Sequence, residues 1–294
     1  MPNLHLFSSP GRDDIRYIID ASRPYLEDKP EATVAYIPLA SLYAERWQAD
    51  TEDAFRKLAR LETINAETMS LTVMEDIIRR AALVYIPGGN TFLLNHRLHV
   101  SRLMLFLRKK VLAGLPVVAF SAGATLCGPN ILTSKDMNTV ETSHFEGLNA
   151  SPFNFSPHYP LDAYGQSVKD DWLSDYHFFH DNPVIMLSDD AHVKMDGKKT
   201  TLVRGEAWIL RKGEEKEKLV EGKLNHFIES SFRDSESISL LMKRIEKSCL
   251  RVDSAAAFLW MRTGILYVPV FLLIFFQPSF DRIVWMLIFF HVTQ

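Results

Sequence analysis

Apolar residues in the first 120 positions alternate between short continuous runs and longer stretches with helical spacing. Continuous runs predict buried strands, whereas apolar residues three and four positions apart predict helices. Between positions 13 and 27, for example, Ile15, Ile18, Ile19 and Ala21 would share one helix face. Such alternation favours an α/β fold with a doubly wound, mostly parallel sheet and flanking helices. The predicted strands are 4–8, 33–39, 83–86 and 117–120, and the predicted helices are 13–27, 51–61, 74–82 and 101–113.

The pattern changes after position 181, where apolar runs become short and closely spaced. Turn sequences such as Asp196-Gly197 and Arg204-Gly205 separate them. Short runs joined by tight turns are typical of antiparallel strands. We therefore expect a small antiparallel extension of the sheet, formed by the runs 184–187, 192–195, 200–203 and 207–210.

The last seventy residues differ in composition from the rest of the chain. The segment 255–277 is apolar apart from Arg262, and about 20 apolar residues suffice to span a membrane. Three interpretations stay open: a membrane anchor, a non-native extension, and a helical appendage that buries this surface against protein. The expected division is an α/β domain over residues 1–223 and an extension over 224–294.

Composition bounds the function without identifying it. The chain has 294 residues, 47% of them hydrophobic, and a formal net charge of −3. That length supports one sizeable core, and the near-neutral charge offers no basic stripe for nucleic acid. Two cysteines form no disulfide framework, and the first residues do not resemble a signal peptide. The expectation is a cytoplasmic protein, with tethering through the C-terminal segment left open.

A serine stands at the end of the strand 117–120. Ser121 is followed by Ala122, Gly123 and Ala124, and then by a stretch compatible with a helix. A serine on a tight strand-to-helix turn is how α/β hydrolases expose a nucleophile, and small neighbours let the substrate approach the backbone. The usual glycine two positions before the serine is replaced by Ala119, so the match is partial.

Two adjacent glycines follow the strand 83–86. Gly88 and Gly89 leave backbone amides free to point at a ligand, as oxyanion holes require. A tight turn in which Asn90 or Thr91 caps the next helix explains the same residues. The lysine of a phosphate-binding loop is absent here, and no dinucleotide fingerprint occurs in the chain.

A histidine lies in a rigid segment further along. His158 sits between Pro157 and Pro160, with Tyr159 following it. A histidine in such a loop is a candidate general base, although a lone histidine is more often a structural, hydrogen-bonding group. Ligands of doubly wound sheets bind at the carboxyl ends of the strands, where both Ser121 and the Gly-Gly turn are expected.

These motifs resemble the dipeptidase E (aspartyl dipeptidase) family of serine peptidases, from about residue 3 to about residue 223. The resemblance implies a fold like that of class I glutamine amidotransferases and no cofactor. The matching segments are Pro87-Gly88-Gly89-Asn90-Thr91, Phe120-Ser121-Ala122-Gly123-Ala124 and Pro157-His158-Tyr159, with weaker matches at 131–137 and 145–148.

The resemblance also implies roles for individual residues. Ser121 would be the nucleophile, His158 its general base, and the amides of Gly89 and Ala122 the oxyanion hole. The acidic member would follow the strand 184–187, where Asp189 is our choice and Asp190 the alternative. Its task would be to orient the imidazole. A solvated turn explains these aspartates equally well, since aspartate favours turns.

The substrate site implied by the resemblance includes Gly88, Asn90 and Lys169. One departure concerns specificity, because Val168 stands where family members that take N-terminal aspartate carry arginine. Arginine clamps a carboxylate with two hydrogen bonds, whereas Lys169 offers a point charge without that geometry. A broader peptide specificity is therefore left open.

The sequence thus predicts a serine-type peptidase acting on small peptides through a Ser-His-Asp triad and an acyl-enzyme. The alternatives are a non-catalytic binding module on the same fold and an esterase or amidase with the same triad. No metal is predicted, because the pairs His96/His99 and His177/His180 lack further ligands. A homodimer is left open, and no nucleic-acid partner is expected.

Overall fold

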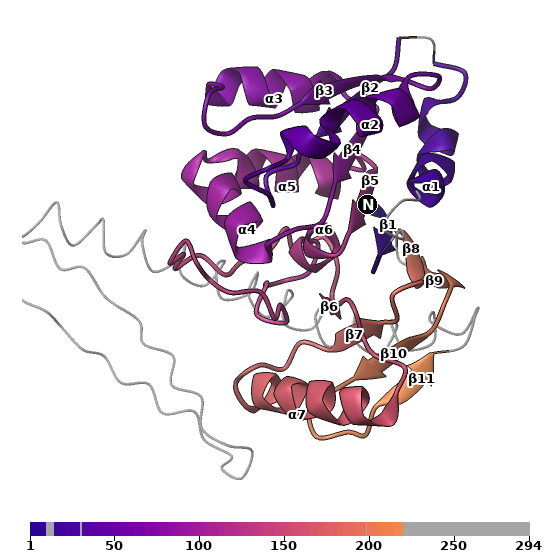
Figure 1. The fold of residues 1–294 in the computed structure, drawn as a ribbon, viewed down its shortest axis with the longest axis vertical. Helices are drawn as coiled ribbons and strands as arrows, with labels where there is room; N and C mark the ends of the chain where they lie inside the picture. Colours follow the sequence, from indigo (N-terminus) through magenta and orange to yellow (C-terminus); the bar gives the residue numbers. More distant parts are fainter. Residues whose placement is uncertain (10–14, 30, 198, 220–294) are drawn as a thin grey trace, which may run out of the picture. The chain divides into compact units, whose positions relative to one another are not determined.

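The computed structural model describes residues 1–9, 15–29, 31–197 and 199–219. Its centre is a seven-stranded sheet in the order β3-β2-β4-β5-β1-β8-β9 (Figure 1). Five of these strands are parallel: β1 (Asn3–Phe7), β2 (Thr33–Tyr36), β3 (Arg60–Thr63), β4 (Leu83–Ile86) and β5 (Val117–Phe120). The predicted α/β fold with a mostly parallel sheet is confirmed.

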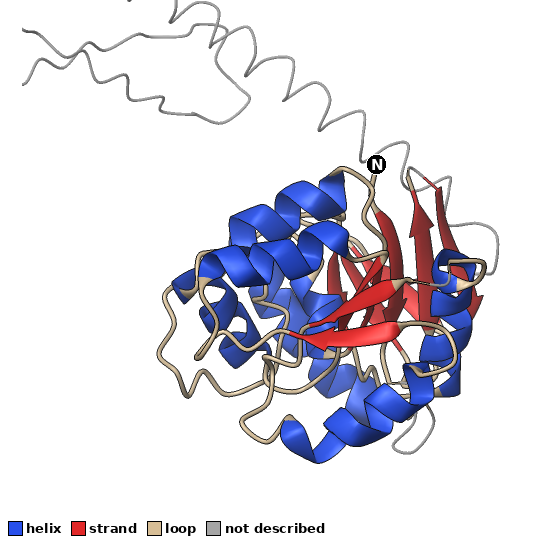
Figure 2. Ribbon diagram, turned by 90° about the horizontal axis from the view of Figure 1, so that it is seen from above, coloured by secondary structure: helices blue, strands red, loops and turns tan. Residues whose placement is uncertain are grey.

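Helices cover both faces of this sheet, as Figure 2 shows. Alternate strand residues face opposite sides: Val117 and Ala119 belong to one apolar cluster, Val118 and Phe120 to the other. Because β5 is buried on both faces, every one of its positions is apolar. The first cluster includes residues of α3 (Leu71–Arg80), α4 (Thr91–Val100), α5 (Leu103–Leu112) and α6 (Ala122–Leu126), and the second includes residues of α1 (Arg16–Leu26) and α2 (Glu45–Phe55).

The prediction of a helix over residues 51–61 is wrong in its position. The helix α2 ends at Phe55, and the edge strand β3 begins at Arg60. Exposed or half-buried residues make up β3, in which Glu62 forms ion pairs with Arg60 and Arg80. A charged edge strand carries no continuous apolar run, so its sequence did not separate it from the amphipathic helix before it.

All four strands predicted after position 181 are present, but they divide between two sheets. β8 (His192–Asp196) and β9 (Lys199–Arg204) extend the main sheet antiparallel beside β1. A second, mixed sheet has the order β11-β10-β7-β6 and carries α7 (Ala163–Phe179) against it. Its strands are β6 (Asn154–Ser156), β7 (Val184–Leu187), β10 (Ala207–Leu210) and β11 (Glu217–Leu219).

Two predictions for the C-terminal part of the chain fall outside the described residues, namely the domain boundary at 223/224 and the apolar segment 255–277. Among the described residues, no helix combines the length and the apolar character that crossing a membrane requires. The anchor, the non-native extension and the buried appendage stay predictions.

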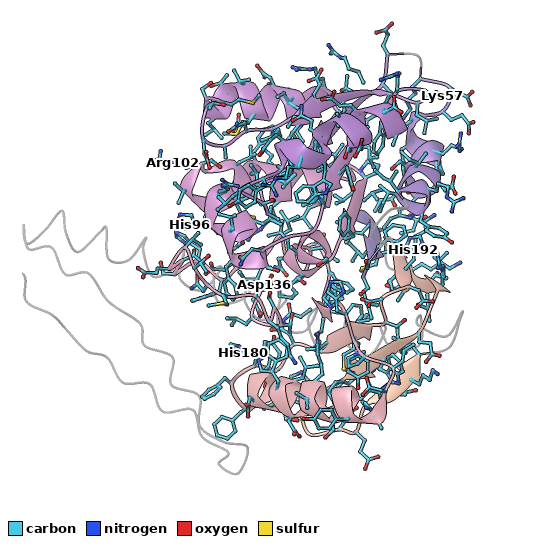
Figure 3. All side chains as sticks on the ribbon, viewed as in Figure 1. Lys57, His96, Arg102, Asp136, His180 and His192 are labelled. Atoms are coloured by element: carbon cyan, nitrogen blue, oxygen red, sulfur yellow. The ribbon has the colours of Figure 1, made fainter. Side chains whose placement is uncertain are left out.

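A buried pair of histidines joins β1 to β8. His5 Nδ1 and His192 Nε2 lie 3.1 Å apart, and His192 stacks on Phe7 (His192 is labelled in Figure 3). Burial, reinforced by neighbouring positive charge, lowers the pKa of His5 to about 4 and that of His192 to about 3. Both rings are therefore neutral in the folded protein at neutral pH.

This pair makes stability depend on pH. In the unfolded chain both histidines take up a proton near pH 6.5, whereas the folded protein resists protonation down to about pH 4 or 3. The contribution of these two histidines to the free energy of unfolding should therefore be fully present above pH 6.5. Below pH 6.5 the free energy of unfolding should fall by up to about 1.4 kcal/mol per pH unit per histidine. Denaturant unfolding between pH 4 and pH 8 measures this dependence. As a control, His144→Gln, which replaces an exposed histidine, should keep the same slope of the free energy of unfolding against pH. A flat profile would contradict it.

Candidate active site

Ser121 lies at the carboxyl end of β5, on the turn into α6. Its backbone has φ +49° and ψ −113°, which is unusual for a residue with a side chain. The turn is tied to the neighbouring strand by a hydrogen bond from Ser121 N to Phe7 O of 3.0 Å. Directly after it, a Cβ on Gly123 would lie 2.3 Å from Ile86 O, so only glycine lets α6 approach β4 this closely. The local backbone thus presents the hydroxyl of Ser121 at the sheet edge.

The structure brings Ser121, His158 and Asp189 into one chain of contacts. Ser121 Oγ lies 3.0 Å from His158 Nε2, and His158 Nδ1 lies 2.5 Å from Asp189 Oδ1. The three residues follow β5, β6 and β7 respectively. Asp190 points elsewhere, since its Oδ1 accepts a hydrogen bond of 2.6 Å from Ser188 Oγ. Imidazole between a hydroxyl and a carboxylate is an arrangement that can remove the hydroxyl proton.

The Gly88-Gly89 turn packs directly against Ser121. A Cβ on Gly88 would lie 3.0 Å from the Cβ of Ser121, so the two turns touch. Gly89 has φ +138°, and a Cβ there would meet Ala40 O at 2.5 Å. Among the described residues, no backbone carbonyl accepts from the amides of Gly89 and Ala122. Ala122 lines the cavity described below and Gly89 does not, and the role of the two amides as an oxyanion hole stays a prediction.

Asn90 serves the local structure. Its Oδ1 accepts a hydrogen bond of 2.9 Å from Leu93 N, which caps α4, and its Nδ2 donates to Met137 O. The side chain does not line the cavity described next. The capping interpretation made from the sequence fits these contacts, whereas the predicted role in substrate binding stays a prediction.

A cavity of about 390 Å³ opens beside Ser121 and His158. Its volume suits a small ligand such as a short peptide. One wall comes from the loop after α6, and the other comes from the loop after β6 and the first turns of α7. The lining residues are Thr91, Ser121, Ala122, Thr125, Thr133, Ser134, Lys135, Asp136, Pro157, His158, Pro160, Tyr164, Gly165, Val168 and Lys169.

Asp136 is a polar feature of this cavity that the sequence did not single out (labelled in Figure 3). Its Oδ2 accepts hydrogen bonds from Thr91 N, Thr91 Oγ1 and Ser134 Oγ, at 2.7, 2.6 and 2.9 Å. Thr91 begins α4, so the carboxylate sits at a helix N-terminus, where negative charge is stabilised. An aspartate in a loop of polar residues carries no such signal before the fold brings it to that helix.

Ser8 is the second residue that the sequence did not single out. It follows β1, so it lies at the same sheet edge as Ser121. Its hydroxyl accepts from His158 N at 2.8 Å and donates to Leu187 O at 3.2 Å. The sequence did hold a signal for Ser8, because a serine directly after a parallel strand lies at the sheet edge where ligands bind.

Lys169 and Val168 lie side by side in α7 and both line the cavity. Lys169 is 7% exposed, and its Nζ donates a hydrogen bond of 2.7 Å to Pro157 O. Burial and the neighbouring Lys135 lower its pKa to about 8, against the opposing effect of Asp189 and Asp136. Val168 is half-exposed and offers no hydrogen bond to a substrate carboxylate. Within the described part of the chain, no group of three His, Cys, Asp or Glu residues is placed to hold a metal ion.

Comparison with known proteins identifies the family. Residues 5–203 match the model of peptidase family S51. The chain is 31% identical over 192 residues to peptidase E of Nostoc sp., which covers 63% of this chain and 78% of that protein. It is also 31% identical over 212 residues to a Drosophila melanogaster protein named probable alpha-aspartyl dipeptidase, covering 68% of this chain and 86% of that one. The chain belongs to peptidase family S51.

Solved structures agree with the S51 fold. A peptidase from an acI-B1 Actinobacterium superposes with a TM-score of 0.59 at 18% identity, covering 76% of this chain and 96% of that one. A peptidase E candidate from Listeria monocytogenes EGD-e gives a TM-score of 0.55 at 24% identity, with 69% and 98% covered. The predicted membership of a serine peptidase family is confirmed, and the matched span lies within the domain predicted over residues 1–223.

Proposed function

We propose that this S51 member hydrolyses small peptides, dipeptides among them, with Ser121 as its nucleophile. The observation that carries the proposal is the contact chain from Ser121 Oγ through both nitrogens of His158 to Asp189, at 3.0 and 2.5 Å. It is supported by the cavity of about 390 Å³ beside Ser121, which suits a short peptide. The names of the matched relatives, peptidase E and alpha-aspartyl dipeptidase, point to the same substrate class.

The proposed reaction starts when His158 Nε2 takes the proton of Ser121 Oγ and the oxygen attacks the peptide carbonyl. The carbonyl oxygen becomes negative and accepts hydrogen bonds from the amides of Gly89 and Ala122. Protonated His158 then donates its proton to the leaving amine, and the C–N bond breaks. Water, deprotonated by His158, attacks the resulting ester and releases the acid. Asp189 holds the imidazole in the required tautomer throughout and stabilises its positive charge.

The proposal is tested by incubating the full-length protein with a panel of dipeptides that includes Asp-X members. We expect release of free amino acids from some of them, and covalent labelling of the protein by a fluorophosphonate, with the label on the peptide that contains Ser121. Fluorophosphonate labelling together with hydrolysis of esters, but not of dipeptides, would favour the esterase alternative. Neither labelling nor turnover by the folded protein would favour the binding module.

Residue 168 should set the response to an N-terminal aspartate. Val168→Arg would place a guanidinium in the cavity wall, where it can hold a carboxylate with two hydrogen bonds. One such charge-assisted contact contributes about 1.5–3 kcal/mol, so kcat/KM for Asp-Leu relative to Ala-Leu should rise about tenfold or more. Val168→Met is the matched control, because it adds length without charge. An unchanged ratio in the arginine variant would remove Val168 from the specificity argument.

A further inference from the structure

A single peptide group in the His158 loop is held from both sides. The carbonyl oxygen of Pro157 accepts from Lys169 Nζ at 2.7 Å, and the amide of His158, in the same peptide group, donates to Ser8 Oγ at 2.8 Å. Lys169 comes from α7 and Ser8 from the end of β1. Both side chains are buried, so water does not compete freely for these two hydrogen bonds.

The loop needs such a restraint because of the backbone conformation at His158. This residue has φ +57°, in the left-handed region that residues with a Cβ occupy at a cost of about 1–3 kcal/mol. Rotation of the Pro157–His158 peptide plane changes that φ and swings the imidazole away from Ser121 Oγ. The next peptide is also fixed, since Tyr159 N donates to Leu187 O at 2.8 Å. The orientation of the Pro157–His158 peptide plane therefore sets the position of the imidazole ring.

The surroundings of Lys169 favour this role over capture of a substrate carboxylate. Its ammonium is buried, and a buried charge needs an acceptor in the protein itself. The Pro157 carbonyl supplies one, and the Trp172 ring lies 5.8 Å from the same nitrogen. Both residues line the cavity, but Val168 is 45% exposed and Lys169 only 7%.

We propose that Lys169 is a positioning residue, which together with Ser8 holds the Pro157–His158 peptide plane and so keeps the imidazole of His158 aligned on Ser121. This inference rests on the proposed function, since it assigns His158 the role of base. It accounts for a buried lysine whose amine contacts the loop of the base. Ser8 and Lys169 act on one peptide group, so their effects on catalysis should not be additive.

The kinetic test compares Lys169→Met with Lys109→Met, an exposed lysine of α5, in the full-length protein. The substrates are the best dipeptide of the panel and p-nitrophenyl acetate, which has neither an ammonium nor a carboxylate. We expect kcat to fall about 10- to 100-fold on both substrates in Lys169→Met, with KM for the dipeptide changed less than about threefold. A rise in KM for the dipeptide with unchanged ester hydrolysis would show substrate binding and overturn the proposal.

A second measurement is independent of turnover. The imidazole Hε1 resonance of His158, assigned by its loss in His158→Gln, reports the position of the ring in NMR spectra. It should shift or broaden in Lys169→Met and in Ser8→Ala, and the double variant should add little. An unmoved resonance in both single variants would overturn the proposal, and if Lys169→Met does not fold, Ser8→Ala decides alone. If the wild-type protein shows no hydrolytic activity but the resonance shifts in the variants, the proposed function is wrong and the positioning role of Lys169 stands.

Discussion

Replacing Ser121 by alanine should lower kcat for the best dipeptide by about 10⁴-fold or more. In the proposed reaction the hydroxyl supplies the oxygen that attacks the carbonyl, and His158, whose Nε2 lies 3.0 Å from Ser121 Oγ, activates it. Alanine removes one atom and leaves the cavity wall in place, so dipeptide binding should persist. Single-turnover and steady-state assays measure the loss, and isothermal titration with the substrate measures the retained binding.

Ser174→Ala is a matched control for this substitution. Ser174 is exposed on α7, and its hydroxyl donates a hydrogen bond to Asp170 O within the same helix. Its variant should keep wild-type kcat and should still react with a fluorophosphonate. Retention of more than a tenth of the wild-type kcat by Ser121→Ala would refute Ser121 as the nucleophile and turn attention to a water-based mechanism.

The two neighbouring aspartates should respond very differently to the same substitution. Asp189→Asn should lower kcat by about 10²- to 10⁴-fold, because an amide no longer holds the imidazole in the tautomer that accepts the serine proton. Asp190→Asn should change kcat less than about tenfold. The reason lies in their contacts: Asp189 Oδ1 is 2.5 Å from His158 Nδ1, whereas Asp190 Oδ1 accepts from Ser188 Oγ.

A loss of folded protein would also lower kcat, so both aspartate variants need a control for folding. Thermal unfolding of both variants controls for folding, and exposure of Asp189, at 74% of its side chain, makes a large loss of stability unexpected. Equal losses in the two variants, or a larger loss in Asp190→Asn, would reassign the acidic role.

Buried strands were the part of the fold that the sequence predicted best. Runs such as 83–86 and 117–120 are apolar at every position because helices cover both faces of the sheet. The edge strand β3 escaped prediction, since its charged residues alternate and it lacks a fully buried face. The division of the later strands between two sheets was also beyond reach, because pairing partners are chosen by contacts distant in sequence.

The sequence by itself determined the residue types at the carboxyl edge of the sheet. Small residues around Ser121, the two glycines of the turn after β4 and the proline-bounded His158 are local patterns with local physical causes. It also carried the family membership, since the S51 family model matches residues 5–203. None of these patterns states a distance between side chains.

Tertiary structure decided which polar residues meet. The choice between Asp189 and Asp190 depends on a contact 31 positions from His158, and the pairing of Ser8 with His158 spans 150 positions. Lys169 looked from the sequence like a charge offered to the substrate, but the packing of α7 directs its amine to Pro157 O. Such contacts are set by how strands and helices of remote segments come together, and a single sequence holds no local signal for that.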